Sequence, residues 1–305
     1  MEFFTTSAGI SVHVWDTKDE RCRVKPGMTE HLTPASDGHL TPADDNPVTP
    51  GSDPGSIVLL HGYLETMYVF NELVEALKEH YRVIVIDMPG HGLTDSAPAD
   101  AEGNRINSLE FQAKVVAGVL DKCGVEKAVI AGHSLGGYVT IQFIKDFPER
   151  AVRAVLLHSH PYPDAPEKSK DRQREKDLIT EGKLLSIAAL SIPKMYYEEN
   201  LRACDEKIRE TVELCETHDP EGIKSSIDGL RTRPDNQAVL QHLPVPLTLV
   251  YGDHDNFLPL ETVAKMKESF PDVDYVLIPG TGHNSFIEKT DEVVRFFDSL
   301  TTRSC

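Results

Sequence analysis

Short runs of apolar residues alternate with longer amphipathic segments along most of the chain. Near the N-terminus, Ile10, Val12 and Val14 alternate with polar neighbours, which predicts two short strands around a turn at 7–9. Farther along, continuous apolar runs are typical of strands that a sheet buries on both faces. The predicted strands of this second kind are Ser56–Leu60, Arg82–Asp87, Lys127–Ala131, Ala154–Leu157, Pro246–Tyr251 and Val273–Ile278.

Between these strands, apolar residues recur with the spacing of one helix face. In the segment before Gly124, for example, Leu109, Val116 and Leu120 share a face, and the glycine is expected to end the helix. The predicted helices are Phe70–His80, Ser108–Cys123, Leu135–Phe147, Glu261–Phe270 and Thr290–Leu300. This succession predicts an α/β fold, in which helices flank both faces of a mostly parallel central sheet.

The segment of about 19–55 departs from this alternation. It contains six of the 20 prolines and few large apolar residues, so it lacks the side chains for a core of its own. It also repeats the motif His-Leu-Thr-Pro-Ala at 31–35 and 39–43, which we interpret as a duplicated loop rather than a metal site. The prediction is a Pro-rich surface insertion, or a partly disordered one.

The segment 160–243 departs from the alternation in another way. It is strongly charged and helical in composition, and it contains no convincing strand. We predict a helical cap, inserted late in the chain between the two parts of one α/β core, 1–159 and 244–305. Sheets of this kind bind ligands at the carboxyl ends of their strands, and the cap is expected to cover that edge.

Charge and composition narrow the classes of partner. The chain has 31 Lys and Arg against 49 Asp and Glu, a formal net charge of −18, which disfavours nucleic acids and anionic membranes. No apolar run approaches the roughly 18 residues of a membrane span, and the first residues lack the pattern of a secretory signal. The five cysteines match no metal or redox motif. We therefore expect a cytoplasmic protein with reduced thiols that acts on a small molecule.

The strongest candidate for chemistry is Gly132-His133-Ser134-Leu135-Gly136, between a predicted strand and a predicted helix. This context matches the G-x-S-x-G nucleophile elbow, in which a sharp turn projects the serine hydroxyl. Glycines at the two ends of the motif let neighbouring backbones approach closely. The start of the following helix also favours negative charge that develops near Ser134.

A serine nucleophile needs a base, and the base needs an acid that orients it. The expected order along such a chain is serine, acid, histidine. Asp255 lies in a loop after the strand that ends at Tyr251, whereas Asp253 lies nearer the strand end, and His283 follows the next strand in a glycine-rich loop. We predict Asp255 as the acid and His283 as the base. The alternatives are Asp253 as the acid and His254 as the base.

Acyl transfer also requires an oxyanion hole. The strand Ser56–Leu60 is followed by His61, Gly62 and Tyr63, and the glycine lets the backbone bend so that an N–H faces the site. The predicted donors are the backbone N–H groups of Tyr63 and Leu135, the latter directly after the candidate nucleophile. His61 is interpreted as structural.

Five motifs along the chain follow one family pattern, namely His61-Gly62, Asp87-Met-Pro-Gly-His-Gly-Leu-Thr-Asp-Ser96, Gly132-His-Ser-Leu-Gly-Gly137, Gly252-x-x-Asp255-x-x-x-Pro259 and Gly282-His283. In these motifs the chain resembles the α/β-hydrolase superfamily, over roughly 1–20 and 56–303. The resemblance implies the triad Ser134, Asp255 and His283 and a helical cap between the sixth and seventh strands. The Pro-rich insertion is a departure that the usual members lack.

Within that superfamily, related haloalkane dehalogenases and epoxide hydrolases carry Asp where this chain has Ser134, which argues against both activities. A serine implies an acyl-enzyme route that needs no cofactor and no metal. The chain most resembles the carboxylesterase and enol-lactonase group, and we predict cleavage of a small carboxylic ester or related acyl compound. The alternatives are a C–C bond hydrolase or perhydrolase with the same triad, or a ligand-binding receptor of this fold.

Substrate specificity is expected in the cap and in the strand-end loops. The most apolar stretch of the cap, 184–192, is interpreted as a lid over the pocket or as a contact with the core. The mixed-charge run 167–176 is interpreted as a solvated helix face, and Arg231 and Arg233 as surface-paired residues. The candidate substrate-binding residues are His158, His160, Leu185, Met195 and Tyr196.

Overall fold

The computed structural model describes residues 1–18 and 55–302, so nearly all of the Pro-rich insertion lies outside the described residues. Within the described ranges, eight strands form one sheet in the order β1-β2-β4-β3-β5-β6-β7-β8. Strand β2 runs antiparallel to both of its neighbours, and the other strand pairs are parallel. The strands are β1 (Glu2–Ser7), β2 (Ile10–Asp16), β3 (Ser56–Leu60), β4 (Arg82–Ile86), β5 (Ala128–His133), β6 (Ala151–Leu157), β7 (Leu247–Gly252) and β8 (Asp274–Ile278).

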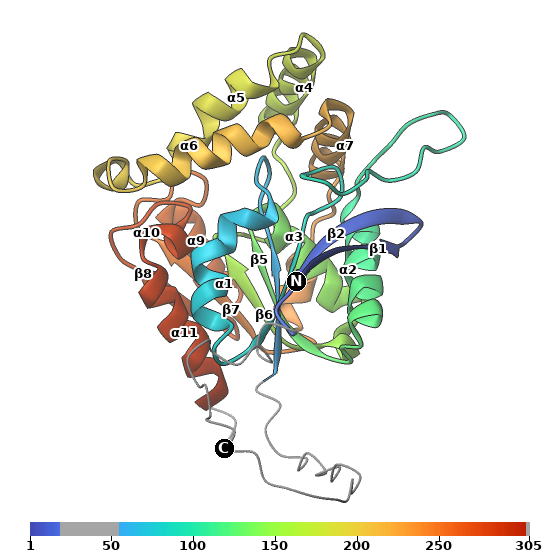
Figure 1. The fold of residues 1–305 in the computed structure, drawn as a ribbon. Coiled ribbons are helices and arrows are strands. Elements are labelled where there is room, and N and C mark those ends of the chain that lie inside the picture. Colours follow the sequence, from blue (N-terminus) through green and yellow to red (C-terminus); the bar gives the residue numbers. More distant parts are fainter. Residues whose placement is uncertain (19–54, 303–305) are drawn as a thin grey trace, which may run out of the picture.

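Helices cover both faces of the sheet, which confirms the predicted α/β architecture (Figure 1). Helices α2, α3 and α9 contribute to one buried apolar cluster, and α1, α10 and α11 contribute to another. Helix α10 was not predicted, because an element of 4 residues is too short to show a periodic pattern. The core helices are α1 (Asn71–Leu77), α2 (Leu109–Cys123), α3 (Leu135–Asp146), α9 (Leu260–Ser269), α10 (Ser285–Glu288) and α11 (Thr290–Thr302).

The continuous apolar run of β3 serves both clusters. Val58 and Leu60 pack into the cluster with α2 and α3, whereas Ile57 and Leu59 pack into the cluster with α1 and α11. None of the four is more than 3% exposed. Burying each such side chain is worth roughly 1.5–3 kcal/mol, so a strand of this composition is stable only inside the sheet.

Two strand boundaries differ from the predicted ones by more than one residue. Strand β5 continues past its predicted end to His133, which brings it directly to Ser134. Strand β6 begins at Ala151 rather than Ala154. Its first residues lie at the margin of the core, where Val152 is 57% exposed, so they lack the buried pattern on which the prediction depended.

The segment between β6 and β7 folds into helices, with no strand in that described stretch, and α4, α5, α6 and α7 lie together above one end of the sheet (Figure 1). They have an apolar cluster of their own, which includes Ile179, Ile208 and Ile227. Leu64, from the loop after β3, joins that cluster and connects the cap to the core. The helices of this segment, called the cap below, are α4 (Pro166–Thr180), α5 (Leu184–Ser191), α6 (Asp205–Leu214), α7 (Pro220–Arg231) and α8 (Gln237–Gln241), and Leu240 of α8 packs into the cluster with α2 and α3 instead.

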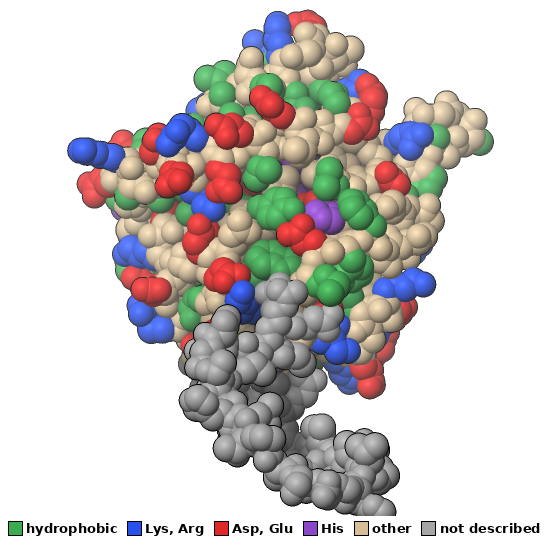
Figure 2. All heavy atoms as spheres, viewed as in Figure 1, with side chains coloured by type: hydrophobic (Ala, Val, Ile, Leu, Met, Phe, Trp, Pro, Cys, Tyr) green, Lys and Arg blue, Asp and Glu red, His purple; other side chains and the backbone are tan. Residues whose placement is uncertain are grey.

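The surface mixes acidic, basic and hydrophobic side chains over the face that Figure 2 shows. Large exposed apolar residues, such as Phe4, Leu190 and Leu260, lie on separate elements. Scattered exposure of this kind is ordinary for a globular protein. Within the described ranges, no helix has the length and apolar character that crossing a membrane requires.

Candidate active site

The backbone reverses sharply between β5 and α3, and Ser134 lies at the turn. Its φ of 48° and ψ of −108° are unusual for a residue with a side chain. The N–H of Ser134 donates to the carbonyl of Leu157 in β6 (3.0 Å), which fixes the turn against the neighbouring strand. Ser134 therefore lies at the N-terminus of α3, in the strand–turn–helix context that the sequence predicts.

Two glycines allow this turn to pack closely. A Cβ atom at Gly132 would overlap the carbonyl of Gly136, and a Cβ atom at Gly136 would overlap the carbonyl of Leu60 in β3. Gly124, which ends α2, is different, because its φ is +64° and an added Cβ would meet nothing within 4 Å. The first two glycines are needed for space, and Gly124 only for its backbone conformation.

We expect Gly132→Ala to cost more than about 3 kcal/mol of unfolding free energy, or to prevent folding, because the backbone it meets cannot move aside cheaply. The matched control Gly124→Ala should cost about 1 kcal/mol, since only its left-handed conformation is penalised. Urea denaturation of both variants measures the difference. Equal stabilities would contradict the close packing at the turn.

Asp255 and His283 meet beyond the carboxyl ends of β7 and β8. The Nδ1 atom of His283 lies 2.9 Å from Oδ1 and 2.8 Å from Oδ2 of Asp255. Both residues are buried. The Oδ1 atom also accepts the backbone N–H groups of Phe257 (2.7 Å) and Leu258 (2.9 Å). These bonds orient the carboxylate and leave the Nε2 atom of His283 for another partner.

Burial by itself would raise the pKa of Asp255, because it disfavours the charged carboxylate. The charge of His283 and hydrogen bonds from two histidines outweigh burial and hold that pKa well below its usual range. Asp255 is therefore ionised at neutral pH inside the protein.

The second histidine at this carboxylate is His158, directly after β6. Its backbone has a left-handed φ of 55°, and its Nδ1 lies 2.9 Å from Oδ2 of Asp255. Its Nε2 lies 2.7 Å from Oγ of Ser285. Burial lowers the pKa of His158 to about 4, although Asp255 acts to raise it. The neutral ring then donates its Nδ1–H to Asp255 and accepts the hydroxyl proton of Ser285.

Ser134 and His283 line one cavity of about 480 Å³, whose walls come from both core and cap. No hydrogen bond joins the two side chains among the contacts of the described residues, and such bonds often tighten only when substrate binds. Tyr63 and Leu135, the predicted oxyanion donors, line the same cavity. Neither backbone N–H donates to another residue in the part of the chain that the structure describes. Both N–H groups are therefore available to a bound oxygen atom.

Some of the predicted substrate-binding residues also line this cavity, namely His158, His160 and Met195. The other two do not line it. Leu185 is 41% exposed, because α5 turns Leu184 and Ala188 into the cluster of the cap instead. Tyr196 is buried in that same cluster.

Helix α4 turns a charged stripe toward the cavity. Lys168, Arg172 and Glu175 follow one another at the spacing of a helical turn, and all three line it. Arg172 pairs with Asp164 (2.5 Å), and Glu175 accepts the hydroxyl of Tyr63 (2.9 Å). The interpretation of this mixed-charge run as a solvated face is therefore wrong for one side of the helix.

Arg233 is buried and is not the surface residue that the sequence suggested. Its guanidinium pairs with Asp164 (2.5 Å) and lies 4.4 Å from the centre of the Tyr138 ring. It lines the same cavity. Arg231, in contrast, pairs with Asp228 in a partly exposed position, as predicted. The cap thus gives the cavity a polar wall.

The sequence reasoning missed Glu65, which is fully buried behind the site. Its carboxylate accepts the N–H of Gly62 (2.7 Å) and lies 2.8 Å from Nδ1 of His133. The Nε2 of His133 lies 3.1 Å from the carbonyl oxygen of His283. Burial would raise the pKa of Glu65, but His133 outweighs burial and lowers it. Through His133, Glu65 connects the loop after β3 to the loop of His283, and its only signal in the sequence was a single acidic residue in the loop after β3.

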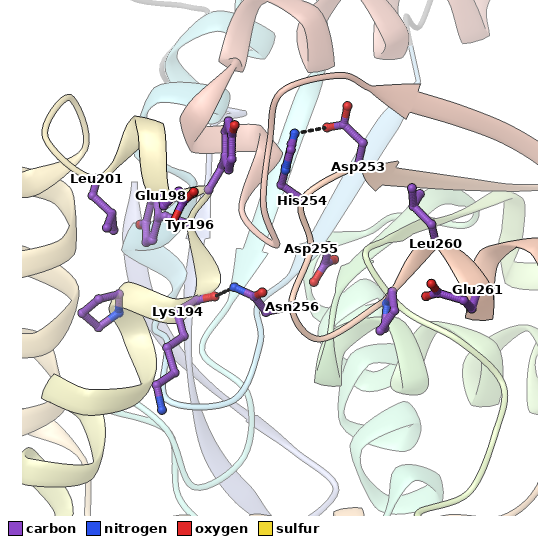
Figure 3. Close-up of a pocket in the computed structure, with 13 residues that line it drawn as sticks. Lys194, Tyr196, Glu198, Leu201, Asp253, His254, Asp255, Asn256, Leu260 and Glu261 are labelled. Atoms are coloured by element: carbon purple, nitrogen blue, oxygen red, sulfur yellow. Dashed lines mark hydrogen bonds and ion pairs between the residues drawn. The ribbon is translucent and has the colours of Figure 1, made fainter.

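A second hollow, of about 640 Å³, lies between the loop of Asp255 and the cap (Figure 3). Asp253 and His254 line it and pair with each other at 3.8 Å. The ring of His254 stacks on Tyr197 with a centroid distance of 3.7 Å. Ser134 does not line this hollow. Asp255 lines this hollow too, but its carboxylate contacts His283, whereas no contact of Asp253 or His254 with the His283 side chain is found among the described residues.

One group within the described ranges has the spacing of a metal site. Its ligand atoms, from His158, Asp255 and His283, lie within 4.8 Å of one another. Both histidines approach the carboxylate through Nδ1 at hydrogen-bond distance, which accounts for the clustering without a metal. That the reaction needs no metal stays a prediction.

Comparison with known sequences places the chain among hydrolases. A pimeloyl-[acyl-carrier protein] methyl ester esterase of Nitrosomonas europaea is 26% identical over 251 residues, covering 80% of this chain and 94% of that protein. A 2-hydroxy-6-oxononadienedioate/2-hydroxy-6-oxononatrienedioate hydrolase of Paraburkholderia phymatum is 27% identical over 212 residues, covering 67% of this chain and 70% of that protein.

Solved structures agree in fold. A thermophilic esterase from Thermogutta terrifontis matches with a TM-score of 0.80 at 23% identity, covering 99% of this chain and 98% of the other. The enol-lactonase from Burkholderia xenovorans LB400 matches with a TM-score of 0.77 at 18% identity, covering 99% and 100%. The family model for the alpha/beta hydrolase fold matches residues 55–290. The chain therefore belongs to the alpha/beta hydrolase fold family and is a hydrolase of that fold.

Proposed function

We propose that the protein is a serine hydrolase that cleaves a small carboxylic ester, or a related acyl compound, through an acyl-enzyme intermediate. Ser134 is the nucleophile, His283 the base and Asp255 the acid that orients the base. The observation that carries this proposal is the buried contact of His283 with both oxygens of Asp255, beside the cavity that Ser134 lines. The similarity to a protein named as a methyl ester esterase supports an ester as the substrate.

In this mechanism the Nδ1–H of His283 donates to Asp255, so the Nε2 lone pair can take the hydroxyl proton of Ser134. The Oγ atom attacks the carbonyl carbon, and the N–H groups of Tyr63 and Leu135 bind the oxygen on which charge develops. The bond to the alcohol then breaks, and the alcohol leaves with the proton from His283. Water, deprotonated at the same Nε2, attacks the acyl-enzyme and releases the acid.

The size of the cavity and the side chains on its cap wall indicate which acyl groups fit. A volume of about 480 Å³ lies in the lower part of the roughly 300–1,000 Å³ range of ligand pockets. Lys168, Arg172 and Glu175 place charged groups on that wall, and a long alkyl chain gains little from burial against charges. We therefore propose short or polar acyl groups.

We expect kcat/KM for p-nitrophenyl acetate or butyrate to exceed that for the dodecanoate by at least about tenfold. Lys168→Leu should narrow this preference, because Lys168 lines the cavity. Lys170→Leu, at an exposed position of the same helix, should leave it unchanged. Initial rates over the ester series measure both effects. An optimum at dodecanoate would contradict the polar pocket, and a folded protein that turns over no ester would contradict ester hydrolysis itself.

A second candidate is hydrolysis of a C–C bond with the same triad. It is favoured by the similarity to the hydrolase named for 2-hydroxy-6-oxononadienedioate. In that case kcat/KM for a 2-hydroxy-6-oxo dienoate should exceed kcat/KM for any p-nitrophenyl ester. The loss of the ultraviolet absorbance of the dienoate measures its cleavage.

A further inference from the structure

We propose that His158 is a positioning residue that holds Asp255 for His283 and extends the activity of the site to lower pH. This inference rests on the proposed serine-hydrolase function. The sequence indicated only a pocket residue at this position, and the mechanism above does not use it.

The sheet topology places His158 between the other members of the site. Strand β6 lies between β5, which ends beside Ser134, and β7, which precedes Asp255. The N–H of His158 donates to the carbonyl of Val250 in β7 (2.9 Å), and its side chain is 0% exposed. The hydrogen bond to β7 therefore fixes the backbone of His158, and the buried ring has no contact with solvent.

The imidazole connects the loop of the acid to the loop of the base. Its Nδ1 lies 2.9 Å from Oδ2 of Asp255, and its Nε2 lies 2.7 Å from Oγ of Ser285. Ser285 lies shortly after His283 in the chain. Removing the ring would release the carboxylate on one side and the loop of His283 on the other.

The backbone of His158 has a left-handed conformation that is uncommon for a residue with a side chain. In the described part of the chain, positive φ values at residues other than glycine occur at Ala8, Leu64, Ser134 and His158, and the last three line the cavity. Asparagine and glycine adopt this conformation more readily than histidine. Strain of this kind persists where the surrounding contacts determine it, and it clusters at functional sites. The two hydrogen bonds of the imidazole offset the free-energy cost of this left-handed backbone conformation.

His158 acts on Asp255 as a neutral donor, because burial lowers its pKa to about 4. A hydrogen bond to a carboxylate stabilises the negative charge where it is. Without this donor, the carboxylate interacts more strongly with the Nδ1–H of His283. Removing the donor should therefore move the acidic limb of Ser134 reactivity to higher pH.

Other titratable groups face this arrangement from neighbouring elements. The ring of His133, from β5, lies 4.8 Å from the ring of His283 and 6.1 Å from that of His158. Glu65 bonds to His133, and His160 lies on the cavity wall. No hydrogen bond from these three to Asp255 is found among the described residues, and all three are unchanged in the variants below.

The test is the rate at which a fluorophosphonate labels Ser134 between pH 4.5 and 9. Labelling joins Oγ to phosphorus and releases fluoride, while the serine proton passes to His283, so it does not depend on the natural substrate. His158→Gly fits the left-handed backbone but has no donor, and we expect the midpoint of its acidic limb to rise by about one pH unit. His158→Asn also tolerates this backbone and places an amide N–H near the former Nδ1, so its midpoint should stay near that of the wild type.

A His158→Gly midpoint equal to that of the wild type would overturn the inference, and so would equal shifts in the Gly and Asn variants. A merely structural role would lower the rate at every pH without moving the midpoint. If thermal melting shows that the Gly variant does not fold, His158→Gln replaces it, because the longer amide reaches toward Ser285 instead of Asp255. A folded wild type that is not labelled at any pH would overturn the proposed function, and this inference with it.

Discussion

Replacing Ser134 with alanine should lower kcat for p-nitrophenyl acetate by about 10⁴-fold or more. The Oγ atom is the one that forms the bond to the acyl carbon, and no other group in the cavity replaces it. The cavity and the backbone donors stay in place, so substrate binding should change little. The hydroxyl forms no hydrogen bond to another residue of the described chain, so the thermal midpoint should stay within a few degrees of wild type.

The matched control is Ser159→Ala. Ser159 is also buried beside the site, and its hydroxyl donates to the carbonyl of Ser134 (2.9 Å). This variant loses a neighbouring hydroxyl but retains the nucleophile, and it should keep at least about a tenth of the activity. Ester turnover that survives in Ser134→Ala would rule out Ser134 as the nucleophile. An equal loss in both variants would show that the effect is not specific to the Oγ atom of Ser134.

The second large effect is expected for Asp255→Asn, which should lower kcat by about 10³–10⁴-fold. The carboxylate accepts N–H groups at both oxygens, from the backbone at Oδ1 and from His158 at Oδ2, while His283 contacts both. An asparagine can keep the acceptor for the backbone, but its NH₂ then faces histidine donors. At least one ring must turn or change tautomer, and His283 loses the orientation that leaves Nε2 free for Ser134.

Asp253→Asn is the control for this substitution, because Asp253 is the competing acid in the same loop. Its Oδ1 accepts the N–H of Gly280 (2.6 Å), a bond that an asparagine oxygen can also accept. We expect less than about a tenfold change in kcat. The reverse ranking, with Asp253→Asn inactive and Asp255→Asn active, would assign the acid to Asp253.

The fold could be predicted from the sequence because its signals are local. The alternation of buried strands and amphipathic helices needs only a few residues at a time, as β3 shows, where neighbouring side chains serve opposite faces. The candidate nucleophile, acid and base were found in the same way, each in a short motif after a strand. The predicted strand boundaries were wrong where a strand leaves the buried core, as at Val152.

What the sequence missed depends on contacts between distant segments. His158 and Asp255 are 97 residues apart, and they meet only because β6 and β7 are neighbours in the sheet. In the sequence of α4, charged residues that line a cavity look the same as charged residues that face solvent. Arg172 was therefore not recognised as a lining residue. The sequence could not show that Leu185 and Tyr196 lie outside the lining of the cavity. An apolar residue in a cap can face solvent, the cap core or the pocket, and local composition is the same in all three cases.

The most direct test of the central claim, an acyl-enzyme at Ser134, is mass spectrometry of enzyme quenched with acid during turnover of p-nitrophenyl butyrate. We expect a butyryl group on the peptide that contains Ser134, and none in the Ser134→Ala protein. A butyryl group on another residue, or steady turnover with no acylated peptide even in excess substrate, would contradict the claim.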